Sequence, residues 1–203
     1  MSPLRLLRTL LIVAAALALG ACRPQGPWQL NRIDGLMPDL SFAMTDDRGR
    51  PVSAEDYRGK PVLLFFGYTS CPDVCASTLA RLAGAIGQVP GGPDAVTVLF
   101  VSVDPSRDSA ERLRRYVGVF GPEFIGLRGS DDALDALVRR YRVTYAYGKP
   151  DADGQYDVIH SSGVFIFDGQ GRARLLAGPN DWSAPIAADL KRLLEGARTP
   201  PAS

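Results

Sequence analysis

The chain has 203 residues, and its 23 Lys and Arg residues against 22 Asp and Glu residues give a formal net charge of only +1. This balance provides no basic surface, so it argues against a nucleic-acid-binding function. The length suits one main domain with a sizeable core, and thiol or imidazole chemistry can draw on only three cysteines and one histidine.

The first 21 residues resemble the secretory signal of a bacterial lipoprotein. Arg5 and Arg8 flank the start of the chain, and the apolar run over 9–20 is too short for an ordinary membrane-spanning helix. The run ends in the sequence LGAC at Cys22, which is similar to a lipobox, where the cysteine is lipidated and becomes the first mature residue. We therefore expect export to the periplasmic or extracytoplasmic face, with lipid on Cys22 holding the protein at a membrane. The alternative is an ordinary signal with an incidental cysteine.

Removal of residues 1–21 leaves 21 basic and 22 acidic residues, so the mature chain has a net charge of about −1. Residues 22–36 begin with a stretch rich in proline and glycine, which predicts a linker between the lipid and the domain. We expect the folded domain over 37–198, and we expect 199–203 to be a frayed C-terminus.

The domain is predicted to begin with a hairpin and a buried strand. Residues 42–52 carry turn residues at Asp46–Gly49 between extended segments, which predicts the hairpin. Residues 62–66, with the sequence VLLFF, form a short continuous apolar run that is typical of a buried strand.

Two cysteines, Cys71 and Cys75, follow this strand, and apolar residues at helical spacing over 79–86 predict a helix after them. If Cys71 is the N-cap of this helix, Pro72 falls at the first helical position and Asp73 in the first turn. Residues four apart on a helix have Cβ atoms about 5–6 Å apart, so the two sulfurs could share a metal ion or close a disulfide. A helix N-terminus lowers the pKa of a cysteine and Asp73 opposes this effect, so the sequence leaves the balance open.

Strands and helices alternate through the rest of the domain. In order, we expect a strand at 96–103, a turn and helix opened by Asp108 and Glu111 as a capping box, a short strand at 124–127, a helix capped by Ser130, a hairpin of strands 163–167 and 172–177, and a last helix from Ser183. This order predicts an α/β, thioredoxin-like fold with a central mixed sheet flanked by helices. The N-terminal hairpin extends that plan, and one helix and the short strand are inserted into it.

The single histidine, His160, precedes the late hairpin. A lone histidine is more often structural than a ligand, but in this fold the hairpin edge lies beside the cysteine turn. Asp104 follows the end of a strand next to the one that carries the turn, which is where open α/β sheets place their sites. A turn and a helix cap explain most of the motif at 104–108, and Asp104 could in addition orient a ligand or partner. Tyr68 and Phe66 are more typical of core residues, although Tyr68 could border a metal ion held by the cysteines.

Three linked motifs resemble the Sco/SenC family of copper chaperones: GYTSCPDVC at 67–75, VDPSRD at 103–108 and VIHS at 158–161. They occur in the family's order and spacing over nearly all of the mature chain. The resemblance implies a membrane-held domain that binds one copper ion through Cys71, Cys75 and His160. It also implies delivery toward the dinuclear copper centre of cytochrome c oxidase, with the copper-site subunit as client and with a copper donor and a thiol reductant as further partners.

The chemistry of the three residues agrees with copper. Two soft thiolates select Cu(I), and an added imidazole makes the set acceptable to Cu(II) as well. A disulfide between Cys71 and Cys75 offers no thiolate, so loading would depend on a reductant.

This chain also departs from the family's usual pattern. Members often have Pro after the second cysteine and Asp before the histidine, where this chain has Ala76 and Ile159. On an extended segment Ile159 faces away from His160, so we expect its effect to be peripheral. Asp157, at an odd offset, would also face away unless a bulge intervenes.

The leading prediction is thus a copper-binding assembly factor rather than an enzyme, and two other functions stay open. A thiol:disulfide oxidoreductase that keeps the cysteines of a copper-site client reduced would use a redox-active disulfide between Cys71 and Cys75 and would not need His160. Redox domains of this fold usually carry the tighter C-x-x-C pair, which counts against it. A thiol peroxidase would need a peroxide-reactive cysteine of low pKa.

Overall fold

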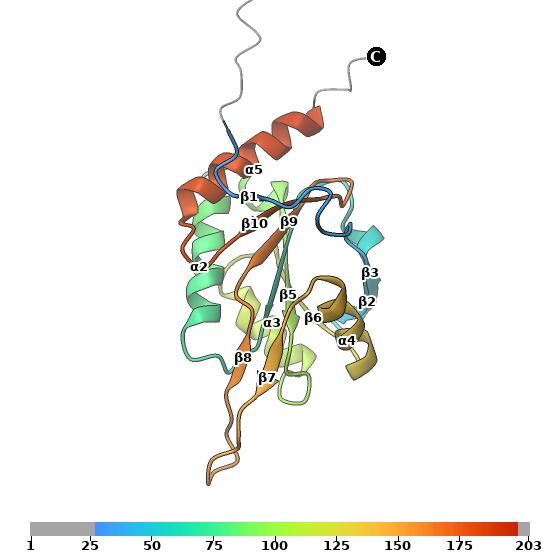
Figure 1. Ribbon diagram of the computed structural model, residues 1–203, viewed down its shortest axis with the longest axis vertical. Coiled ribbons are helices and arrows are strands. Elements are labelled where there is room, and N and C mark those ends of the chain that lie inside the picture. Colours follow the sequence, from blue (N-terminus) through green and yellow to red (C-terminus); the bar gives the residue numbers. More distant parts are fainter. Residues whose placement is uncertain (1–26, 199–203) are drawn as a thin grey trace, which may run out of the picture.

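The computed structural model describes residues 27–198, and Figure 1 shows how its elements are arranged. The strands of the main sheet are β1 (Asn31–Arg32), β2 (Ala43–Asp46), β3 (Pro51–Ser53), β4 (Val62–Gly67), β5 (Thr97–Ser102), β6 (Phe124–Arg128), β9 (Val164–Phe167) and β10 (Ala173–Ala177). The helices are η1 (Ala54–Tyr57), α2 (Val74–Ile86), η2 (Gly92–Ala95), α3 (Ala110–Gly118), α4 (Asp131–Arg140) and α5 (Ser183–Arg198), and β7 (Tyr145–Tyr147) pairs with β8 (Val158–His160) in a separate ribbon.

The main sheet has the order β1-β10-β9-β4-β5-β6-β2-β3. Strands β4, β5 and β6 are parallel, and the other pairs are antiparallel. Every residue of β4 and β5 is buried, because helices cover both faces of these apolar runs. In Figure 1, α2 and α4 lie on opposite sides of the sheet, and α5 packs against α2. The predicted mixed sheet flanked by helices is confirmed.

Both predicted hairpins are present, and each is closed by a turn in which an aspartate side chain accepts backbone hydrogen bonds. The carboxylates of Asp46 and Asp168 each accept hydrogen bonds from backbone N–H groups two and four residues later. Gly49 and Gly171 follow at positive φ, 79° and 74°, which a glycine adopts without steric cost. These turns fix the pairing of β2 with β3 and of β9 with β10.

The N-terminal part of the described chain belongs to the folded unit from before residue 37. Asn31 and Arg32 form β1 against β10, and the N–H groups of Gln29 and Leu30 donate to the buried carboxylate of Asp189 in α5. Residues 29–32 of the predicted linker are therefore bonded to the domain, and Leu30 and Ile33 are buried, while the boundary at residue 36 stays a prediction. The predicted signal over 1–21, Cys22 and the C-terminal stretch 199–203 lie outside the described residues.

The ribbon of β7 and β8 was not predicted as a separate element. It projects from one end of the domain in Figure 1, and the described chain begins at the other end, near α5. Between residues 27 and 198, no helix combines the length and the apolar character that crossing a bilayer requires.

Candidate metal centre

The cysteine turn joins β4 to α2, but the helix begins later than predicted. The expected N-cap at Cys71 and first helical residue at Pro72 are wrong, since α2 begins at Val74 with Asp73 as its N-cap. The N–H of Cys71 donates to the carbonyl of Tyr68 over 3.2 Å, which closes a turn ahead of the helix. Cys71 thus lies in the loop, and only the second cysteine is helical.

The two thiols are both free and differ in exposure, with Cys75 fully buried and Cys71 partly exposed. The N–H of Cys75 lies 3.4 Å from the sulfur of Cys71 and donates to it. Burial raises the pKa of Cys75 strongly, and the neighbouring Cys71 adds to this effect. Burial therefore outweighs the helix N-terminus at Cys75, so without a metal this residue is a protonated thiol at neutral pH.

His160 lies at the end of β8, and its imidazole faces the buried thiol. Its Nε2 is 3.4 Å from the sulfur of Cys75, and its Nδ1 is 3.0 Å from the carbonyl oxygen of Ser161. A carbonyl only accepts, so Nδ1 carries the proton and the Nε2 lone pair points toward the thiols. Burial lowers the pKa of His160. The imidazole is thus held neutral and in the tautomer that a metal ligand needs.

The structure brings together the three residues that the sequence singled out. The ligand atoms of Cys71, Cys75 and His160 all lie within 4.8 Å of one another. Two of them come from the strand-to-helix turn and one from the ribbon, 85 residues later. Two sulfurs and one imidazole nitrogen at this separation fit a soft metal ion such as copper.

A cleft of about 400 Å³ opens beside the ligands, and its walls are mainly apolar. Tyr68, Pro72, Val74, Ile159 and Pro179 are among the residues that line it, together with Cys71 and His160. Ile159 is 76% exposed, and its neighbours along β8 are buried or half-buried. This alternation along β8 agrees with side chains of residues 159 and 160 that leave the strand in opposite directions, and Ile159 lies on the exposed side of the cleft. Cys71 and His160 are partly exposed in this cleft, so another molecule can approach them from solvent.

Asp108 does not cap α3 as predicted. Ser109 is the N-cap and accepts from the N–H of Arg112, whereas Asp108 is fully buried. The carboxylate of Asp108 instead accepts from the N–H and the hydroxyl of Thr69 and, over 2.6 Å, from the hydroxyl of Ser102. Asp108 thereby ties the cysteine turn to the end of β5. The prediction failed because the spacing of a capping box carries no information on burial.

Asp104 and Tyr68, the two candidates for the surroundings of the ligands, have different positions. Asp104 is buried and accepts from Arg107, Ser106 and Tyr156, so it does not reach the three-residue group directly. The ring of Tyr68 packs edge-on against the imidazole of His160, with 5.9 Å between ring centres. A role of either residue toward a metal stays a prediction.

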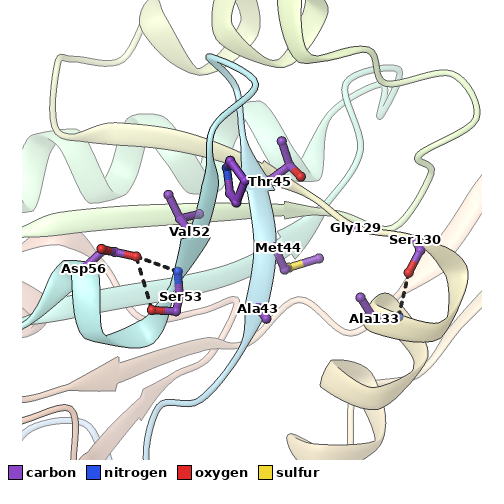
Figure 2. A pocket seen from close by; sticks show the side chains of 10 residues that line it. Ala43, Met44, Thr45, Val52, Ser53, Asp56, Gly129, Ser130 and Ala133 are labelled. Carbon is purple, nitrogen blue, oxygen red and sulfur yellow. Dashed lines mark hydrogen bonds between the residues drawn. The ribbon is translucent and has the colours of Figure 1, made fainter.

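A larger hollow of about 520 Å³ lies away from these residues, between the β2–β3 hairpin and the start of α4 (Figure 2). Three of its polar residues have partners within its walls: Asp56 accepts from Ser53, and Ser130 caps α4 as predicted by accepting from the N–H of Ala133. No thiol or imidazole lines it. The chemistry of the described chain is therefore concentrated at the smaller cleft.

Comparison with known proteins agrees with the geometry. A sequence model of the SCO1/SenC family matches residues 36–195. The chain is 41% identical over 133 residues to the mitochondrial SCO2 homologue of Bos taurus, which covers 64% of this chain and 50% of that protein. The chain spans about half the length of the curated relatives it matches.

Two solved structures share the fold. Apo Sco1 from Thermus thermophilus is 36% identical, with a TM-score of 0.74 over 84% of this chain and 99% of that one. ScoI of Arabidopsis thaliana with copper bound is 30% identical, with a TM-score of 0.71 over 78% of this chain and 98% of that one. The predicted thioredoxin-like fold class is thereby confirmed.

Proposed function

Since the chain belongs to the SCO1/SenC family, whose members are copper chaperones for cytochrome c oxidase assembly, we propose that it carries one copper ion on Cys71, Cys75 and His160. The observation that supports this most is the convergence of the three ligand atoms within 4.8 Å. Copper is here the cargo of the protein, and the site is the place where it is held in transit.

The ligand set suits a carrier that works in both oxidation states. Two thiolates satisfy Cu(I), and the neutral Nε2 of His160 adds the nitrogen that Cu(II) prefers. Relatives of this fold have been solved with copper bound, among them ScoI of Arabidopsis thaliana and of Bradyrhizobium japonicum. Binding requires both thiols to lose their protons and excludes a disulfide between them.

The proposed client is the copper-site subunit of cytochrome c oxidase, and the proposed partners are a copper donor and a thiol reductant. The partly exposed sulfur of Cys71 and the apolar cleft beside it give such partners access to the metal. A thiol-rich client site could then compete for the ion by replacing one ligand at a time.

We further propose a lipid anchor on Cys22 at the extracytoplasmic face, followed by a linker and one copper-binding domain up to about residue 198. The described chain starts at the end of the domain opposite to the β7–β8 ribbon (Figure 1). A tether attached at that end would leave the cleft directed away from the membrane. Labelling of the protein with radioactive palmitate, lost in Cys22→Ser, tests the anchor.

An anaerobic Cu(I) competition titration tests copper binding. We expect one Cu(I) per chain and a loss of affinity of about 100-fold or more when Cys71 and Cys75 are both replaced by serine, because even groups around a ligand change affinity about 10- to 100-fold. Ser77→Ala, on the exposed side of α2, is the matched control and should bind as the parent does. Equal affinity in the double variant and the parent would overturn the proposal.

A thiol:disulfide oxidoreductase is the second candidate, favoured by the difference in exposure between the two thiols. In that reaction Cys71 and Cys75 would give two electrons and two protons to a client disulfide and would become a disulfide themselves, which an external dithiol would then reduce. The raised pKa of Cys75 works against this, because the thiolate is the reactive form.

The reduction potential of the pair separates the two functions. A potential below about −300 mV is typical of a stable disulfide that does not turn over. A potential well above that value, together with client reduction that survives His160→Ala, would favour the oxidoreductase. Loss of function in His160→Ala with the potential unchanged would favour the copper carrier.

A further inference from the structure

The position of His160 is not fixed by the main sheet. Its strand, β8, pairs only with β7, and these two strands form the separate ribbon at one end of the domain (Figure 1). The two thiols, in contrast, follow directly from β4 and α2. The distance from the imidazole to the sulfurs therefore depends on whatever holds the ribbon down.

Residues of the turn that follows β5 contact the ribbon at Tyr156, two residues before β8. The guanidinium of Arg107 is bonded to the buried carboxylate of Asp104, and its carbon lies 3.6 Å from the ring centre of Tyr156. The hydroxyl of Tyr156 donates to Asp104 over 3.0 Å and lies 3.2 Å from the hydroxyl of Ser106. We call Asp104, Arg107 and Tyr156 the clasp.

The side chain of Arg107 is held between a carboxylate and two tyrosine rings. Its side chain is only 18% exposed, and its Nη2 is buried with no hydrogen-bond partner within residues 27–198. The faces of Tyr156 and, at 5.7 Å, Tyr68 lie against the cation instead. Such cation–π contacts are attractive, so they favour the position of the ribbon in which Tyr156 and Tyr68 lie against the guanidinium.

Tyr68 connects the clasp to the imidazole of His160. Tyr68, which borders Arg107, packs edge-on against His160, and its hydroxyl accepts from the N–H of Val158 over 3.3 Å. Val158 and His160 are the two ends of β8. Tyr68 thus contacts the guanidinium of Arg107 on one side and both ends of the strand that carries His160 on the other.

We propose that Arg107, fixed by Asp104 and stacked on Tyr156, is a positioning residue that seats His160 against Cys71 and Cys75. This proposal rests on the copper-carrier function. A lifted ribbon leaves the two thiolates in place, so Cu(I) keeps its main ligands while Cu(II) loses its nitrogen. The apparent Cu(II) affinity then falls in proportion to the fraction of molecules with the ribbon seated.

A double-mutant cycle on Cu(II) affinity tests the proposal, with EPR on the same samples to report nitrogen coordination. Arg107→Ala is measured in the parent and in His160→Ala. Arg192→Ala is the matched control, because Arg192 is also paired with a buried aspartate, Asp189, and stacked on an aromatic ring, Trp28 at 4.7 Å, away from the cleft. Urea denaturation of each variant establishes that it is folded.

We expect Arg107→Ala to lower the Cu(II) affinity about 10-fold, to weaken the nitrogen signal in the EPR spectrum and to change the Cu(I) affinity by less than about 3-fold. In His160→Ala it should have no further effect, so that the coupling equals its whole effect. Arg192→Ala should leave the Cu(II) affinity unchanged. Tyr156→Phe keeps the stacked ring and removes the hydroxyl contacts with Asp104 and Ser106, so a smaller loss with the same dependence on His160 is expected even if Arg107→Ala does not fold.

Equal losses in the parent and in His160→Ala would show that Arg107 acts through the thiols or the fold, and this result would overturn the inference while copper binding stands. An unchanged EPR spectrum and affinity in both clasp variants would do the same. Failure of the parent to bind copper at all would overturn the proposed function and the inference together.

Discussion

The cysteine turn and the β7–β8 ribbon carry the three residues of the proposed copper site, but they are held in different ways. Cys75 is fully buried in the first turn of α2. The turn before it is held by the hydrogen bond from the N–H of Thr69 to Asp108. His160 is half-buried on a two-stranded ribbon outside the main sheet, and side chains hold it in place. Cys75 is thus held by the core itself, whereas the imidazole has its own local equilibrium. A carrier built in this way can change its number of ligands without unfolding.

The substitution expected to have the largest effect on the cysteine turn is Asp108→Ala. It leaves the N–H and the hydroxyl of the half-buried Thr69, and the hydroxyl of the buried Ser102, without their acceptor. Unpaired donors of this kind cost about 1–3 kcal/mol each where they are buried, and we expect a total loss of about 3 kcal/mol. We expect that loss in urea denaturation and a fall in Cu(I) affinity as the turn loosens. Asp132→Ala, at an exposed position in α4, should change stability by less than about 0.5 kcal/mol. Equal stability of the two variants would show that Asp108 does not hold the turn.

The second largest loss of stability and of Cu(I) affinity is expected for Gly67→Ala. A Cβ at residue 67 would lie 2.7 Å from a ring carbon of Phe100 and 2.9 Å from the sulfur of Cys75. Overpacking of this kind costs about 1–3 kcal/mol, and here it also pushes a ligand atom, so the Cu(I) affinity should fall with the stability. Gly196→Ala, in α5 with nothing near its Cβ, should instead stabilise by about 0.5–1 kcal/mol. Unchanged Cu(I) affinity in Gly67→Ala would mean that the sulfur can move freely.

The contrast between the cysteine turn and the ribbon also explains which features could be predicted from the sequence. The apolar run of β4, the hairpin turn at Asp46 and the helix cap at Ser130 follow from local patterns, so those elements were correctly predicted. The proximity of His160 to the thiols was suggested by the fold plan and the family resemblance, and the structure brings these residues together. The roles of the three as metal ligands stay a prediction.

The errors arose where tertiary contacts override a local pattern. The start of α2 was placed too early because the turn from Tyr68 to Cys71 competes with the helix for the same backbone. Asp108 was read as a cap, although it lies inside the protein. The β7–β8 ribbon was missed because three-residue strands separated by ten residues give no periodic signal.

Tyr147→Phe tests the ribbon side with a smaller expected effect. The hydroxyl of Tyr147 donates to the carbonyl of Val103 over 2.8 Å, and its loss should cost about 1 kcal/mol. We expect hydrogen exchange of the β8 amides to rise about 5-fold while the β4 amides keep their rates. Tyr141→Phe, which removes a hydroxyl bound to Asp39 away from the ribbon, should show no such selectivity. An equal rise in β4 would mean that ribbon and sheet open together.

The smallest effect is expected at Ile159, where the family resemblance led us to expect an acidic residue. Its side chain is 76% exposed and alternates with His160 along β8, so we expect a carboxylate placed there to stay in solvent at the outer side of the cleft unless the strand turns over. Exposed substitutions of this kind usually change free energies by less than about 0.5 kcal/mol, so Ile159→Asp should alter the Cu(II) affinity by no more than about 2-fold. A gain of 10-fold or more in a competition titration would show that the ribbon rotates when copper binds. The imidazole would then be seated by the metal itself and not by the contacts beneath it.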